Sequence, residues 1–272
     1  MTPEIELTAA AIRTADALLI GAGAGMGVDS GLPDFRGPEG FWKAYPPFRG
    51  RRFEDMSTPH WFDTDPAVAW GFFGHRLNLY RSAIPHRGFA HLQRWGAERP
   101  LGAFVFTSNV DGQFQQAGFP ESEIVERHGS IHFLQCTARC GQELWPAAGV
   151  QVQVDETTIR CRSVFPVCPA CGAIARPNIL MFDDGDWDRT RCTQQLARDV
   201  AWLRRVEGRR VVAVEIGAGL VIPTVRDECE RRSHVLVRIN PREALTGSGS
   251  ISLPMGGLEA LDAVDAVLRS TA

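Results

Sequence analysis

Four closely spaced glycines follow a short apolar run near the beginning of the sequence. Residues 15–20 read ADALLI, which is typical of a buried parallel strand, and residues 21–37 read GAGAGMGVDSGLPDFRG. Glycines at the end of such a strand let backbone N–H groups approach a pyrophosphate, and the start of a following helix adds the positive end of its dipole. The segment therefore predicts a nucleotide-binding turn.

The residues around these glycines argue against a dehydrogenase. No register satisfies the spacing GxGxxG, because the sixth position is Met26, Val28 or Ser30. A dehydrogenase would continue into a helix and a second strand that ends in an acid, whereas residues 33–36 read PDFR. An acid, an aromatic ring and a guanidinium are suited to binding a cationic heteroaromatic ring and its ribose. Hydride transfer is disfavoured, and a tight turn without a ligand is the alternative for the glycines alone.

Three further apolar runs, which we expect to be strands, also end in small or polar residues. The runs 103–107, 211–216 and 235–239 are followed by Ser108-Asn109-Val110-Asp111, by Gly217-Ala218-Gly219 and by Asn240. The carboxyl ends of parallel strands meet at one edge of a sheet, so these residues predict one crevice long enough for a dinucleotide. An Asx turn is the alternative for residues 108–111. Glu215, inside a strand, has no explanation from the sequence.

Two cysteine pairs flank an insert in the middle of the chain. They are Cys136 with Cys140, and Cys168 with Cys171. Four thiolates suit a closed tetrahedral zinc site, which would fold a ribbon too small to have its own core. We therefore expect a structural zinc, with Cys161 as a spare that could replace one ligand. Cys192 and Cys229 are expected to be thiols packed within helices.

The composition is that of an ordinary globular chain. Its 272 residues, 44% of them hydrophobic, suffice for one core and a small appended module. The net charge of −3 shows no excess of the positive charge that is typical of nucleic-acid-binding proteins. Glu4 and Glu6 stand where a secretory signal would carry positive charge, and no apolar run approaches membrane-spanning length. We expect a cytoplasmic protein without nucleic-acid or membrane partners, and the sequence predicts no particular oligomeric state.

The helices that would support the strands are expected from apolar periodicity. They cover residues 2–15, 57–82, 85–95, 187–208 and a closing stretch from residue 258. Four histidines are expected to be structural: His60, His75, His91 and His132.

Residues 23–36, GAGMGVDSGLPDFR, resemble the signature of the sirtuins, the NAD-dependent protein lysine deacylases. Later segments resemble the family in the same order, with SNVDG at 108–112 and HGS at 128–130. The resemblance implies an α/β fold in which a Rossmann-type parallel sheet carries a smaller domain of zinc ribbon and helices. The implied NAD-binding domain comprises residues 1–37, 85–135 and 175–272, and the small domain a helical module at 38–84 and the ribbon at 136–174.

The resemblance also assigns roles to single residues. His128 would be the general base, a role that suits imidazole because its ordinary pKa lies near neutrality. Asn109 would take part in catalysis by engaging the ribose, and Phe35 would screen the reactive carbon from water. The residues expected to bind NAD are Gly23, Ala24, Gly25, Asp34, Phe35, Arg36, Ser108, Asn109, Asp111, Gly217, Ala218 and Asn240.

Residues 176–182, RPNILMF, resemble the segment against which the substrate peptide of a sirtuin pairs as an added strand. We expect this segment to return the chain to the main sheet. The residues expected to contact the peptide are Ile179, Leu180 and Phe182. Asp183 and Asp184 stand in place of the Gly-Glu of the family, and we expect these acids, together with Asp186, to crowd the peptide.

The implied activity is the NAD-dependent removal of an acyl group from a lysine of a protein or peptide, with release of nicotinamide and O-acyl-ADP-ribose. Ser108 replaces the glutamine that the family has beside the reacting ribose. Two alternatives therefore remain. One is an enzyme that splits NAD without an acylated lysine, by hydrolysis or by ADP-ribosyl transfer, and the other is a non-catalytic NAD-sensing module.

Overall fold

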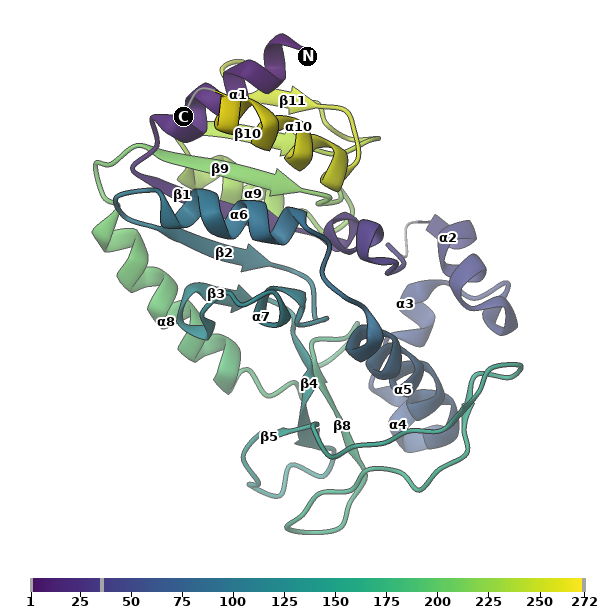
Figure 1. The fold of residues 1–272 in the computed structure, drawn as a ribbon. Coiled ribbons are helices and arrows are strands. Elements are labelled where there is room, and N and C mark those ends of the chain that lie inside the picture. Colours follow the sequence, from purple (N-terminus) through teal and green to yellow (C-terminus); the bar gives the residue numbers. More distant parts are fainter. Residues whose placement is uncertain (1, 35–36, 271–272) are drawn as a thin grey trace.

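The main element of the fold is a six-stranded sheet with the strand order β11-β10-β9-β1-β2-β3, in which every neighbouring pair is parallel. The computed structural model describes residues 2–34 and 37–270 (Figure 1). The strands are β1 (Ala17–Ala22), β2 (Ala103–Thr107), β3 (Ile124–Glu126), β9 (Val211–Ile216), β10 (Val235–Ile239) and β11 (Ile251–Leu253). All residues of β1 and β9 are buried, as expected for central strands covered on both faces. The four strands predicted from apolar runs are therefore confirmed.

Helices cover both faces of this sheet (Figure 1). On one face lie α1 (Pro3–Arg13), α6 (Gly88–Ala97) and α10 (Gly257–Ser270), and on the other α8 (Thr190–Arg205) and α9 (Thr224–Arg232). The alternation of side chains along β1 divides the core accordingly, because Leu18 and Ile20 pack on the first face whereas Leu19 packs on the second. No helix in the described parts of the chain is both long and apolar enough to cross a membrane.

A second core belongs to helices and small antiparallel sheets. Its helices are α2 (Gly37–Ala44), α3 (Phe53–Met56), α4 (His60–Thr64) and α5 (Pro66–Ser82). Its strands are β4 (Gly129–Cys136), β5 (Trp145–Pro146) and β8 (Ala175–Ile179), which form one sheet, and β6 (Val154–Asp155) and β7 (Arg160–Cys161), which form another. Helix α5 crosses the second sheet closely, since a Cβ atom on Gly71 would lie 2.0 Å from the carbonyl oxygen of Ile159.

Four short helices connect these elements. They are η1 (Ala24–Ser30), η2 (Pro46–Phe48), η3 (Glu121–Glu123) and α7 (Gln113–Gln116).

The expectation that residues 176–182 return the chain to the main sheet is wrong. Strand β8 instead pairs antiparallel with β4, with Ile179 opposite Gly129 and Ala175 opposite Cys136, at the edge of the three-stranded sheet. Pro177 has no N–H to donate, which confines such a segment to an edge strand and excludes it from the interior of a parallel sheet. The domain boundaries inferred above stay a prediction, with this strand placed in the small sheet.

Candidate active site

The strand order reverses between β1 and β9. From β1 the chain moves outward to β2 and β3, and it later returns beside β1 as β9 and moves outward in the opposite direction to β10 and β11. Open parallel sheets bind ligands outside the carboxyl ends of their strands at such a reversal. Both glycine turns leave the sheet at this place, since one follows β1 and the other follows β9.

The two glycine turns contact each other through their backbones. The N–H of Gly23 donates to the carbonyl of Ile216 (3.0 Å), and that of Gly25 donates to the carbonyl of Gly217 (3.1 Å). A Cβ atom on Gly23 would lie 2.6 Å from Cα of Ala218, and one on Gly25 would lie 2.6 Å from Cα of Gly217. Only glycine allows this approach. Because two loops far apart in sequence meet here, they form one continuous backbone surface at the end of the sheet.

Asn109 lies beside the first turn. It follows β2, the neighbour of β1, and its side-chain Nδ2 donates to the carbonyl of Gly23 (3.0 Å). Asp111, two residues further on, is 9% exposed, and its Oδ1 accepts a hydrogen bond from the N–H of Gln113 (2.9 Å). Burial raises the pKa of Asp111 to about 6, although that hydrogen bond acts in the opposite direction. The structure therefore joins Asn109 to the first glycine turn, and the contact of Asp111 with a ligand stays a prediction.

His128 lies in the turn between β3 and β4. Its carbonyl accepts a hydrogen bond from the N–H of Leu180 (2.9 Å), which joins the turn to the segment after β8. Burial lowers the pKa of His128 to about 4, with a further contribution from the positive charge of Arg127, whereas a backbone hydrogen bond with Ser108 opposes this shift. The imidazole is therefore neutral at neutral pH. It has a free lone pair that can accept a proton, and it lies next to the carboxyl end of β2.

The four paired cysteines form one cluster. Their sulfur atoms all lie within 4.8 Å of one another, and the Sγ–Sγ distance is 3.6 Å both for Cys136 with Cys171 and for Cys140 with Cys168. Four sulfurs at about 2.3 Å from a tetrahedral zinc ion would be roughly 3.8 Å apart, so the cluster fits a structural zinc site. Cys161 lies outside it, on β7, where its Sγ contacts Ser163.

The Sir2 family model matches residues 23–201, which include the first glycine turn, His128 and the cysteine cluster. The chain belongs to the Sir2 family. The fold agrees with this assignment, because this Sir2-family chain aligns with a crystal structure of a Sir2 homologue in complex with NAD over 98% of its own length and 95% of that chain, at a TM-score of 0.71 and 23% identity. A Sir2 homologue in complex with ADP-ribose aligns with the same TM-score and identity.

Curated relatives of this Sir2-family chain come from archaea and bacteria. An NAD-dependent protein deacylase of Aeropyrum pernix is 32% identical over 162 residues, which are 60% of this chain and 58% of that protein. The NAD-dependent protein deacylase 1 of Archaeoglobus fulgidus is 28% identical over 248 residues, which are 88% of each protein. The alignment with the first relative thus spans less than two thirds of that relative's length.

The peptide-side candidates of this Sir2-family chain lie next to His128. Besides the Leu180 hydrogen bond, the N–H of Phe182 donates to the carbonyl of Ser57 (2.9 Å), and Ile179 is 3% exposed. Asp183 has a φ of 54°, a conformation that favours glycine, which is the residue that the resemblance leads one to expect there.

The neighbouring acid, Asp184, is bonded to the peptide segment itself. Its carboxylate is buried and accepts hydrogen bonds from Arg176 (2.9 and 2.8 Å) and from the N–H of Met181 (3.2 Å). The expected crowding by Asp184 is therefore wrong, because its side chain is 0% exposed and its charge is paired with Arg176.

Two other predicted residues are held by neighbours. Asp34 forms an ion pair with Arg242, which follows β10. Asn240 is 1% exposed. In the described structure its side-chain amide forms hydrogen bonds only with backbone groups, so this side chain anchors the backbone around it. Phe35 and Arg36 lie outside the described residues.

Sequence reasoning missed three arginines near the second turn: Arg226 of α9, Arg238 of β10 and Arg242, which follows β10. Arg238 explains Glu215, because the two residues are direct neighbours in the β9–β10 register and form hydrogen bonds of 2.7 Å at both carboxylate oxygens. The signal was available, since opposite charges at matching positions of two neighbouring apolar strands indicate a pair.

Proposed function

We propose that this Sir2-family protein is an NAD-dependent protein lysine deacylase. The observation that carries the proposal is the neutral imidazole of His128, which follows β3 and so lies at the edge of the sheet where both glycine turns also leave the carboxyl ends of their strands. The names of the relatives from Aeropyrum pernix and Archaeoglobus fulgidus support the same activity. The similar structures described as complexes with NAD and ADP-ribose support the dinucleotide.

The residues of the crevice have separate tasks in this proposal. The backbone N–H groups of Ala24, Ala218 and Gly219, which are not used in the contact between the two turns, would bind the pyrophosphate. Asn109, held by its hydrogen bond to Gly23, would orient the ribose, and Asp111 would face the carboxamide of the nicotinamide. When bound, NAD supplies the ribose hydroxyl that receives the acyl group, and nicotinamide leaves.

His128 would act on the ribose hydroxyl. A neutral imidazole can take the hydroxyl proton as oxygen becomes bonded to the acyl carbon. In the complete reaction, acyl-lysine, NAD and water give lysine, nicotinamide and O-acyl-ADP-ribose. The low pKa of His128 keeps the base unprotonated, which is the state that this step needs.

The acyl-lysine would lie against the segment after β8, next to His128. A substrate peptide could add its backbone at this edge, because β8 is the last strand of its sheet. A similar structure describes a Sir2 protein with a deacetylated peptide and 3'-O-acetyl ADP-ribose, at a TM-score of 0.68 and 20% identity. We further propose that the cysteine cluster holds zinc as a structural ion, because all four ligand positions are filled by thiolates.

Product analysis tests the activity. The protein would be incubated with NAD, with and without acetyl-lysine and succinyl-lysine peptides, and the products identified by mass spectrometry. O-acyl-ADP-ribose formed only with a peptide supports the proposal. Free ADP-ribose in equal amounts without peptide would instead indicate an NAD hydrolase, transfer of ADP-ribose to protein would indicate a transferase, and binding without turnover would indicate an NAD-sensing module.

A further inference from the structure

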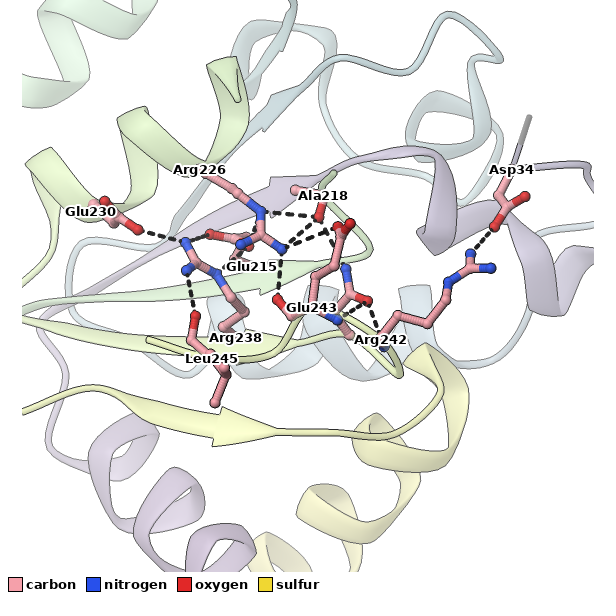
Figure 2. A network of polar contacts seen from close by, with 10 residues as sticks. Asp34, Glu215, Ala218, Arg226, Glu230, Arg238, Arg242, Glu243 and Leu245 are labelled. Carbon is pink, nitrogen blue, oxygen red and sulfur yellow. Dashed lines mark hydrogen bonds and ion pairs between the residues drawn. The ribbon is translucent and has the colours of Figure 1, made fainter. Parts of the chain in front are cut away.

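A network of charged residues lies directly behind the second glycine turn (Figure 2). Glu215 of β9 is buried between Arg238 of β10 and Arg226 of α9, with the closest contacts at 2.7 Å to Arg238 and 3.9 Å to Arg226. The side chain of Arg226 is 6% exposed, and its Nη2 also donates to the carbonyl of Glu243 (2.7 Å). A buried charge of this kind is costly unless it is fully paired, which indicates a specific task for the arginine.

The network ends on a single backbone atom, the carbonyl oxygen of Ala218. Nε and Nη2 of Arg226 donate to this oxygen at 3.2 and 3.0 Å, and Nδ2 of Asn240 donates to it at 3.0 Å. Asn240 is itself held, because its Oδ1 accepts the N–H groups of Arg242 and Glu243, each at 3.0 Å. Three donors from two elements therefore fix the orientation of one peptide group in the turn.

Fixing that carbonyl also fixes the amide on the other side of the same peptide group. In a trans peptide the C=O and the following N–H point in opposite directions. The carbonyl of Ala218 points toward Arg226 (Figure 2) and also accepts from Asn240, so the N–H of Gly219 points away from both residues. Within the described structure, the N–H groups of Ala218, Gly219 and Leu220 have no hydrogen-bond partner.

The side chain that performs this task comes from outside the turn. The turn reads Gly217-Ala218-Gly219, so it has no hydroxyl group of its own. We propose that Arg226 is a positioning residue that orients the amide groups of the second glycine turn toward bound NAD through the Ala218 carbonyl. This inference rests on the proposed function, because it concerns the binding of the same dinucleotide.

A matched control lies on the same helix. Arg232 is also on α9 and has a side chain that is 7% exposed, and it pairs with both carboxylate oxygens of Asp199 at 2.9 and 2.8 Å. Asp199 belongs to α8, so this pair joins two helices beneath the sheet and makes no contact with either glycine turn. Replacing each arginine by lysine keeps the charge but removes the planar guanidinium with its several donor nitrogens.

The experiment measures NAD binding by calorimetry, steady-state kinetics and thermal unfolding on the full-length chain. For Arg226→Lys we expect the Kd and KM for NAD to rise about tenfold or more, as for the loss of a well-placed hydrogen bond to a charged group, while kcat at saturating NAD stays within about threefold. Asn240→Asp keeps the acceptor oxygen for Arg242 and Glu243 and removes the donor to Ala218, so we expect a similar rise. For Arg232→Lys we expect a lower Tm with a Kd within about twofold of wild type.

The outcomes separate this inference from the proposed function. NAD binding of wild-type strength in Arg226→Lys and Asn240→Asp would overturn it, and so would a loss of affinity in Arg232→Lys equal to that in Arg226→Lys. If Arg226→Lys does not fold, Asn240→Asp decides in the same way. A wild-type protein that binds no NAD would refute the proposed function and this inference together.

Discussion

Gly25 donates a backbone hydrogen bond to Gly217 across the boundary between the two halves of the sheet. The two residues lie at the ends of neighbouring strands, β1 and β9, and are far apart in the sequence. Their contact has no side chain between the backbones, so the shape of the dinucleotide crevice depends on it directly.

Gly25→Ala should therefore disrupt the crevice. The added Cβ would overlap with the backbone of Gly217 at 2.6 Å, and backbone atoms cannot move aside as a flexible side chain can. We expect a loss of NAD binding of about a hundredfold and a destabilisation of about 1–3 kcal/mol. Gly149→Ala is the control, because a Cβ there meets no atom within 4 Å. Equal NAD affinity in the two variants would contradict the role given to this contact.

Asp111→Asn should separate stability from activity. The folded pKa of about 6 lies above the value of about 3.9 in the unfolded chain, so the folded state binds the proton more readily and loses stability as pH rises through this window. The asparagine cannot ionise, and its oxygen can still accept from Gln113. We expect the variant to be more stable than wild type by about 1–3 kcal/mol at pH 8 and equal to it near pH 3.5.

The measurement for Asp111→Asn is denaturant unfolding at both pH values, together with deacylation rates. If Asp111 faces the nicotinamide carboxamide as proposed, the gain in stability should be accompanied by a higher KM for NAD. A variant less stable than wild type at pH 8 would contradict this prediction, because it would show that neighbouring groups stabilise the ionised form of the buried carboxylate.

His128→Ala should abolish acyl transfer while NAD still binds. Rates should fall by about a hundredfold or more, which is the usual contribution of a general base. In wild type, the lowered pKa predicts that the acid limb of kcat/KM lies below pH 6. Unchanged deacylation in His128→Ala would remove this residue from the role of base.

The same histidine predicts a pH dependence of stability. The unfolded chain takes up a proton at a pKa of about 6.5, whereas the folded state resists it until about pH 4. The stability associated with the neutral imidazole is complete above pH 6.5 and is lost as pH falls toward 4. Unfolding curves of His128→Ala should show less of this loss than those of wild type.

Much of the main sheet could be predicted from the sequence. Strands β1, β2, β9 and β10 are mostly apolar runs followed by glycine or polar residues, with Glu215 in β9 and Arg238 in β10 as the charged exceptions, and central parallel strands have few other sequence patterns. The placement of β8 could not be read in the same way, because a run that contains Arg176 and Asn178 is apolar only at some positions and its polar groups find partners from other segments. Asn178, for example, donates to Gln135 of β4 (2.9 Å).

The sequence predicted which residues belong to the site better than it predicted the contacts between them. The sequence places Gly23, Asn109 and Gly217 at strand ends, but it does not state which strands are neighbours, and so the backbone contact of the turns could not be foreseen. Arg226 was missed because an arginine in a short polar helix is normally a solvent-exposed residue. Its burial depends on Glu215, which is adjacent to it only in the folded chain.

Cys168→Ser should release zinc and unfold the ribbon. Removing one of four thiolates opens a closed site, and structural zinc provides much of the folding free energy of a small ribbon. We expect metal analysis to fall from about one zinc per chain to near zero, with loss of activity. Cys161→Ser, which changes a thiol outside the cluster, should keep its zinc. A soluble, metal-free and fully active Cys168→Ser protein would contradict the zinc assignment.

The ion pair between Asp34 and Arg242 has a consequence for the response to ionic strength. It ties the loop after η1 to the loop after β10, and its side chains are 21% and 58% exposed, so dissolved ions screen it. Added sodium chloride should weaken this ion pair and raise the Kd for NAD. Between about 0.05 and 0.5 M salt, the rise in Kd should be about twofold smaller in Arg242→Gln than in wild type, as expected for the loss of a surface ion pair. The strength of this contact is thus set by the surrounding solution, whereas the contact between Gly25 and Gly217 joins backbone groups that carry no net charge.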